Sequence, residues 1–206
     1  HSHAHIHCDD ELFKKPLFSP FSYLQFREGL SRKEIYGFKL NTYQFRVQKI
    51  DDPLQFVNTI HSRGYKIIGL KRRNLLRQTI SHMYALHRNV FHQRNVSERR
   101  LQRPFSVNLG DLERELSMFE SYRVLRDQIL SHFPYFELYY EDDLSDTAQH
   151  QATIDRISDY LNVPSSEVQT HLTKTTPRNL SNFVTNFDEV KAFLRNTKYA
   201  EFLEMS

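Results

Sequence analysis

Apolar residues recur along this chain with two different periods, and stretches of the two kinds alternate. Residues 35–40, 65–70 and 135–140 are short runs rich in β-branched and aromatic residues, which predicts buried strands. Elsewhere apolar residues return every three or four positions, which predicts amphipathic helices. Strands that alternate with helices indicate an α/β protein in which crossover helices connect the strands of a parallel sheet.

Start and stop signals give the boundaries of the helices. Asp52 as an N-cap, followed by Pro53 at the first helical position, predicts a helix that ends at Gly64. Asn108 is a second N-cap, and the polar, basic stretch from residue 96 to 104 is typical of a loop. Further helices are predicted over residues 74–91, 108–132, 154–162 and 187–194.

Length and composition indicate one globular domain. The chain has 206 residues, 39 % of them hydrophobic, and no repeat or Gly-, Pro- or Ser-rich linker divides it, so a single domain over residues 1–206 is expected. Cys8 is the only cysteine, which excludes an intrachain disulfide and is typical of a reducing compartment. No apolar run approaches the roughly 20 residues of a bilayer span, and no signal-peptide pattern is seen, so a cytoplasmic protein is expected.

Positive charge is concentrated in the middle of the chain, although the net charge is only +3. Residues 63–103 contain eleven lysines and arginines and a single acid, Glu98. Such a block favours an anionic partner (a nucleotide, an acidic glycan, a nucleic acid or an acidic membrane), and the plainer interpretation is a solvated helix face. Because Tyr84 and Phe91 lie within the block and could stack on bases, a polyanion- or nucleic-acid-binding module is one candidate function.

The predicted strand at residues 65–70 continues through a basic turn into a helix. Open α/β sheets bind their ligands in the crevice at the carboxyl ends of the strands. Arg73 in this turn and Ser81, eight residues later on the helix, suit a phosphate or sulfate group. The alternatives are an exposed turn arginine and a serine that bonds its own helix backbone.

This Arg-Asn helix start, with Ser81 eight positions on, resembles the 3′-phosphate-binding segment of sulfotransferases, which use 3′-phosphoadenosine 5′-phosphosulfate as sulfuryl donor. The run Tyr-Glu-Asp at 140–142 and the segments 161–164 and 174–178 extend the resemblance, closest to bacterial members, over most of the chain. It implies a three-layer parallel sheet with flanking helices, like that of P-loop nucleoside kinases. It also implies transfer of a sulfuryl group, without a metal, to a hydroxyl or amine acceptor, with a carbohydrate or glycolipid as the first choice.

The resemblance also implies roles for individual residues. Arg73 and Ser81 would hold the 3′-phosphate, and Tyr140 would contact the adenine. Lys174 and Arg178 would belong to a basic loop that closes over the nucleotide. The alternative for Tyr140 is a core tyrosine at a strand end. The alternative for Lys174 and Arg178 is a surface loop with two charges.

Sulfuryl transfer needs a base for the acceptor's proton and a cation for the charge on the leaving phosphate. Asn41 stands where many cytosolic members carry a base histidine, and an amide cannot take that role. Glu11 matches a segment in which several bacterial and glycan-directed members use a glutamate, so Glu11 is the candidate base and Asp10 its competitor. Lys39 is the candidate cation at the transferring group. The alternative for Glu11 is a carboxylate that caps a helix or turn, and the alternative for Lys39 is a solvated lysine.

The family's glycine-rich 5′-phosphosulfate loop has no counterpart, because none of the five glycines lies in such a loop. Residues 1–13 resemble the helix end that follows this loop in the family, with Ala4 in place of a proline. The first strand and its loop are therefore expected upstream, and the chain without them is expected to bind the donor poorly. A catalytically inactive, sulfotransferase-like scaffold is a further alternative.

Histidines alternate at positions 1, 3, 5 and 7, and a strand would place all four on one face. Imidazole suits zinc, copper or nickel. No cysteine or carboxylate elsewhere has matching spacing, so we expect no metal site.

Overall fold

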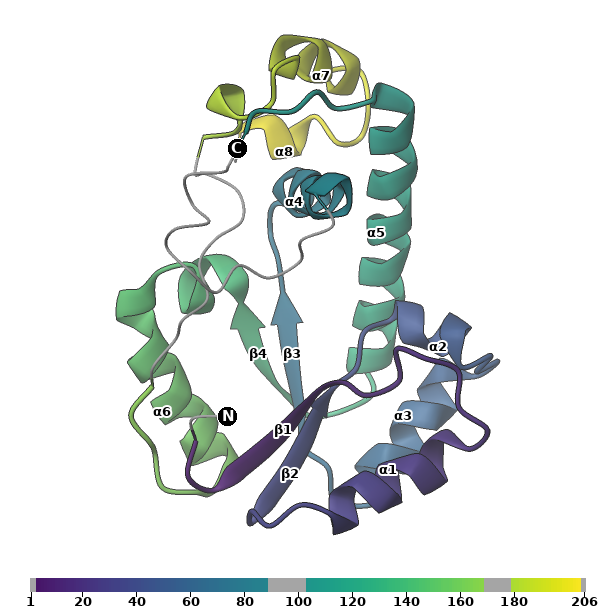
Figure 1. Ribbon diagram of the computed structural model, residues 1–206, viewed down its shortest axis with the longest axis vertical. Coiled ribbons are helices and arrows are strands. Elements are labelled where there is room, and N and C mark those ends of the chain that lie inside the picture. The colour runs from purple at the N-terminus through teal and green to yellow at the C-terminus, as the bar shows by residue number, and fades with distance from the viewer. Residues whose placement is uncertain (1–2, 89–102, 169–178, 205–206) are drawn as a thin grey trace. The chain divides into compact units, whose positions relative to one another are not determined.

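The computed structural model describes residues 3–88, 103–168 and 179–204. The chain is an α/β protein that forms two compact units (Figure 1). Unit 1 consists of His1–Lys71 and Tyr122–Gln169, and unit 2 consists of Arg72–Ser121 and Thr170–Ser206.

Unit 1 contains four strands that pair in two parallel couples. They are β1 (Ile6–Glu11), β2 (Ile35–Lys39), β3 (Ile67–Lys71) and β4 (Tyr135–Tyr139). β1 pairs with β2 and β3 pairs with β4, so the parallel pairing is as predicted, but the described strands form two two-stranded sheets instead of one. The register places Glu11 opposite Lys39, after a bulge that begins at Asp9.

The start of the chain differs from the helix end that the family resemblance indicated. Ile6–Glu11 is a strand, because its backbone pairs with that of β2. Just before the strand, the His5 carbonyl accepts a hydrogen bond from Ile35 N at 3.1 Å. The strands expected at 35–40, 65–70 and 135–140 lie within one or two residues of β2, β3 and β4.

One helix of unit 1 begins at the cap that the sequence predicted. In α3 (Pro53–His61) the side chain of Asp52 accepts a hydrogen bond from Gln55 N at 2.9 Å. α6 (His150–Leu161) ends at Asn162, which takes the left-handed conformation with φ of 62° that closes many helices. The remaining helices are α1 (Pro20–Gly29), α2 (Tyr43–Val47) and the C-terminal part of α5 (Leu109–Leu130), and the core contains Phe13, Leu24, Phe45, Phe56, Val57, Ile60 and Ile129.

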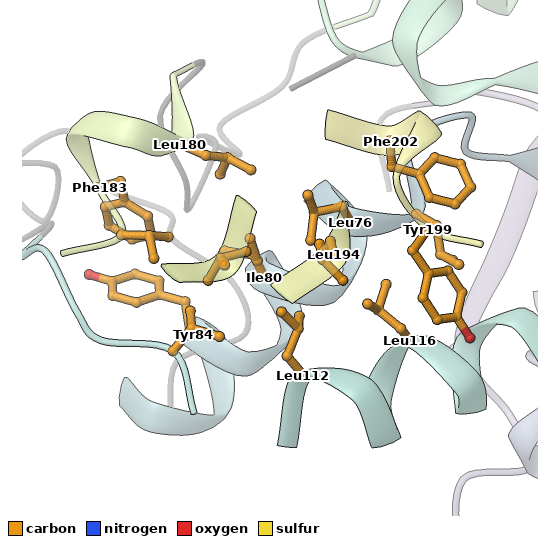
Figure 2. Packing of buried hydrophobic residues seen from close by; sticks show 14 of the residues in the cluster. Leu76, Ile80, Tyr84, Leu112, Leu116, Leu180, Phe183, Leu194, Tyr199 and Phe202 are labelled. Carbon is orange, nitrogen blue, oxygen red and sulfur yellow. The ribbon is translucent and has the colours of Figure 1, made fainter. Parts of the chain in front are cut away.

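Unit 2 consists mainly of helices that pack together: α4 (Leu75–Arg88), the first part of α5, α7 (Phe187–Leu194) and α8 (Glu201–Glu204). Its core brings together side chains that are far apart in sequence, among them Leu76, Leu112 and Phe202 (Figure 2). Asn108 caps α5 by accepting from Asp111 N at 3.0 Å, as predicted. The predicted end of α4 at residue 91 and most of the predicted loop at 96–104 lie outside the described residues.

Within the described ranges, no helix combines the length and the apolar character that a membrane crossing requires.

Candidate functional site

Glu11 lies at the carboxyl end of β1, and three side chains from β2 and the chain after it donate hydrogen bonds to its carboxylate. Lys39 Nζ donates to Oε1 at 3.1 Å, and Asn41 Nδ2 donates to the same oxygen at 2.7 Å. Tyr43 donates its hydroxyl proton to Oε2 at 2.5 Å. The structure thus joins the two residues predicted as catalytic, Glu11 and Lys39, and adds Asn41 and Tyr43, whose part the sequence did not reveal.

These donors decide the charge of Glu11. Burial raises the pKa of its carboxyl group, but the hydrogen bonds from Tyr43, Lys39 and Asn41 together with the charge of Lys39 outweigh burial, so the pKa lies below its usual value. Burial and the bond to Glu11 raise the pKa of Tyr43. At neutral pH the glutamate is therefore ionised and the tyrosine keeps its proton.

The start of α2 explains how the amide of Asn41 reaches Glu11. Gln44, which is fully buried, accepts a hydrogen bond from Asn41 N through its side-chain Oε1 at 3.2 Å, and its own N–H donates to Asn41 O at 2.9 Å. Gln44 thus bonds both backbone groups of Asn41, which lies just before Thr42, the N-cap of α2 (Tyr43–Val47). The side chain of Asn41 is consequently directed to Glu11, although asparagines at helix starts usually cap their own helix.

The competitor carboxylate, Asp10, is exposed at the bulge of β1. Its neighbour Asp9 belongs to a different network, because Asp9 accepts from Arg27 Nη2 at 2.7 Å and from the Tyr36 hydroxyl at 2.7 Å. Of the three consecutive acids on β1, Glu11 is the one that Lys39 pairs with, which favours Glu11 over Asp10 as the reactive group.

The predicted phosphate-binding residues lie in unit 2, at the start of α4 and one face of it. Arg73 and Ser81 are both half-buried. Asn74, which separates Arg73 from the helix, accepts from Arg77 N at 2.8 Å and donates to the Phe202 carbonyl at 3.2 Å. The basic turn is thereby fixed to α8, which holds the start of α4 in one position.

Tyr140 is half-buried at the carboxyl end of β4 in unit 1, where the chain forms a single wide helical turn, Tyr140–Leu144. Asp143, the acid that follows the Tyr-Glu-Asp run at 140–142, fixes this turn. Asp143 is buried, accepts from Tyr139 N at 2.6 Å and pairs with Arg156 Nη1 at 2.9 Å. Asp143 therefore has a structural role.

Two predicted nucleotide contacts, Lys174 and Arg178, lie outside the described residues. The histidines at 3, 5 and 7 have separate partners, namely Ser158 at 3.3 Å, Glu34 at 2.9 Å and Asp9 at 3.3 Å. In the part of the chain that the structure describes, no three His, Cys, Asp or Glu side chains form a metal-binding group.

Comparison of the chain with family models, with curated proteins and with solved structures gives no match.

Proposed function

We propose that this protein is a sulfotransferase that moves the sulfuryl group of 3′-phosphoadenosine 5′-phosphosulfate to an acceptor hydroxyl, with a carbohydrate or glycolipid as the acceptor class. The observation that carries the proposal is the ionised carboxylate of Glu11, held beside the ammonium of Lys39 at the carboxyl ends of two parallel strands. Ligands of open α/β sheets bind at these strand ends.

In the proposed reaction, Glu11 takes the proton of the acceptor hydroxyl while the oxygen attacks sulfur. The bond between sulfur and the bridging phosphate oxygen breaks, and its electron pair leaves on 3′,5′-adenosine bisphosphate. Lys39 stabilises the transferring group, since an ammonium has three N–H donors and one of them bonds Glu11. A low pKa makes Glu11 a weak base but keeps it unprotonated at neutral pH.

The donor would be held by residues that the sequence resemblance identifies. Arg73 and Ser81 would bind the 3′-phosphate, and the anchoring of Asn74 supports this by fixing the turn that presents Arg73. Tyr140 would contact the adenine. Lys174 and Arg178 stay predictions of the sequence.

A polyanion-binding module is the second candidate, and the described part of the basic block favours it less. Lys71 bonds Glu137 and donates to the Tyr135 hydroxyl at 3.0 Å. Lys66 donates to the Tyr160 carbonyl at 2.5 Å. These two cations are engaged within unit 1, whereas a polyanion site needs cations directed to solvent.

Calorimetric titration with adenosine 3′-monophosphate and with adenosine 5′-monophosphate tests the proposal. The 3′-isomer should bind more tightly, and Arg73→Ala should remove this preference, because losing a charge-assisted phosphate contact costs on the order of 1.5–3 kcal/mol, about ten-fold or more in affinity. Arg114→Ala is the matched control, since Arg114 is exposed on α5 and pairs with Asp111, one turn earlier on the same helix, at 2.9 Å. Equal affinity for the two isomers, or no effect of Arg73→Ala, would contradict the proposed site.

A further inference from the structure

Exposed apolar side chains gather on one helix of unit 1. Phe18 is fully exposed, and Phe26 and Leu30 are each 61 % exposed, which makes them the three most exposed large apolar residues of the described chain. Phe26 and Leu30 lie one turn apart at the end of α1, and Phe18 lies just before its N-cap, Ser19. Single exposed apolar residues are common on protein surfaces, but three within and directly beside one short helix indicate an interaction site.

The opposite side of α1 holds the helix in place. Leu24 is fully buried in the core of unit 1, and Phe21 packs against the same core. Arg27 pairs with Asp9 on β1 at 2.7 Å. Since these contacts fix the orientation of α1, the exposed side cannot turn inward without unpacking the core.

Basic residues flank the apolar side chains at both ends. Lys14 and Lys15 precede Phe18, and Arg32 follows Leu30; all three are exposed. Lys33 is exposed too, but its ammonium donates to the Ala4 carbonyl at 2.5 Å. Residues 14–34 contain five basic and two acidic residues, so this short segment carries as much net positive charge as the whole chain.

Of the two acids of this segment, Glu34 pairs with His5 at 2.9 Å, and Glu28 is exposed. The loop that carries the first lysine pair is also fixed, because Gln48 Nε2 donates to the carbonyls of Phe13 at 2.8 Å and Lys15 at 2.6 Å. The positive charges therefore flank the apolar side chains in a defined arrangement.

We propose that this surface binds a membrane that contains anionic lipid. We call it the α1 surface, and it consists of Lys14, Lys15, Phe18, Phe26, Leu30 and Arg32. Apolar side chains on a helix that lies in the membrane interface enter the boundary of the acyl chains, and flanking lysines and arginines contact anionic headgroups. This inference does not depend on the proposed sulfotransferase activity.

The α1 surface suits a lipid bilayer better than a protein groove. Its apolar side chains are exposed, and the other exposed residues of α1 are Ser22, Gln25, Glu28 and Gly29, with one charge among them. Apolar side chains between cationic ones match the layers of an anionic membrane, whose headgroups are negative and whose interior is apolar.

Tryptophan fluorescence provides the first test, because the chain contains no tryptophan. Phe18→Trp and Phe26→Trp should each give a blue shift when vesicles of phosphatidylcholine with phosphatidylserine are added, and little shift with pure phosphatidylcholine. Leu86→Trp is the control, since Leu86 is 52 % exposed but lies on α4 in unit 2. An equal shift of the control, or no shift of Phe18→Trp and Phe26→Trp, would overturn the proposal.

Co-sedimentation with the same vesicles tests the two contributions separately. Phe18→Ser should weaken binding about ten-fold, because burying one phenylalanine side chain contributes about 1.5 kcal/mol or more. Lys14→Glu with Lys15→Glu should weaken it further and remove its salt dependence in part. Val124→Ser, at an exposed position away from the α1 surface, should leave binding unchanged. Binding that is insensitive to the first two changes would contradict the proposed surface.

Discussion

At the scale of single residues, the candidate site depends on how one carboxylate is held. Glu11 accepts hydrogen bonds from an ammonium, an amide and a phenol, and each favours the ionised form. The sequence identified Glu11 and Lys39 through a family resemblance. It gave no signal for Tyr43, because a tyrosine at the start of a short helix is equally consistent with a core residue.

Tyr43→Phe is expected to raise the pKa of Glu11 towards its usual value. The substitution removes one donor to the carboxylate but leaves its burial unchanged, and a bond to a charged group contributes about 1.5 kcal/mol or more. Carbon-detected NMR of the glutamate side chain over a pH titration measures this value. Tyr160→Phe, which loses a hydroxyl that bonds the Ile67 carbonyl, should leave the titration of Glu11 unchanged. A Glu11 pKa that stays constant or falls in Tyr43→Phe contradicts the description of the cluster.

The same residue makes stability depend on pH. The pKa of Glu11 is lower in the folded protein than the ordinary value of 4.5, so the unfolded chain binds the proton more tightly. The stabilisation is complete above that ordinary value and disappears as the pH falls through the lower folded-state pKa. Urea unfolding should show that Tyr43→Phe loses stability at neutral pH and approaches the wild type in acid.

At the scale of elements, two glycines show how the packing around a backbone position decides whether it tolerates a side chain. A Cβ atom at Gly69 in β3 would lie 3.0 Å from Leu130 Cδ1 and 3.0 Å from Tyr135 Cδ2. A Cβ atom at Gly29, the last residue of α1, would have no neighbour within 4 Å. The sequence alone does not separate these two positions.

Gly69→Ala is expected to destabilise the protein by about 1–3 kcal/mol, because Leu130 and Tyr135 must shift to make room. Gly29→Ala should be neutral or stabilise by roughly 0.5 kcal/mol, since alanine restricts the unfolded chain and favours a helix. Chemical denaturation of both variants measures the difference. A Gly69→Ala variant as stable as Gly29→Ala would show that β3 and the end of α5 do not pack this closely.

At the scale of the whole molecule, the two hydrophobic cores consist of different residues. The core that contains Leu76, Leu112 and Phe202 belongs to unit 2, and the core that contains Phe13 and Phe56 belongs to unit 1. The single domain expected over residues 1–206 thus contains two compact units, each with a core of its own.

Phe202→Ala is expected to destabilise unit 2 by about 3 kcal/mol, because it removes a buried ring and disturbs the carbonyl that anchors Asn74. Hydrogen exchange followed by mass spectrometry should show lower protection in α4 and α7 and little change in β1 and β2. Leu86→Ala, on the exposed side of α4, is the matched control. Equal loss of protection in both units would show that they unfold as one.

The sequence by itself determined the α/β class, the helix starts at Asp52 and Asn108 and the end of α6 at Asn162, because periodicity and capping are local properties. It also placed Glu11 and Lys39 among the candidates. Only the tertiary structure decided which side chains bond Glu11, that Asp143 fixes the turn after β4, and that α1 keeps an apolar side exposed. These features depend on strand register and on packing between segments far apart in the chain, and no local pattern encodes such contacts.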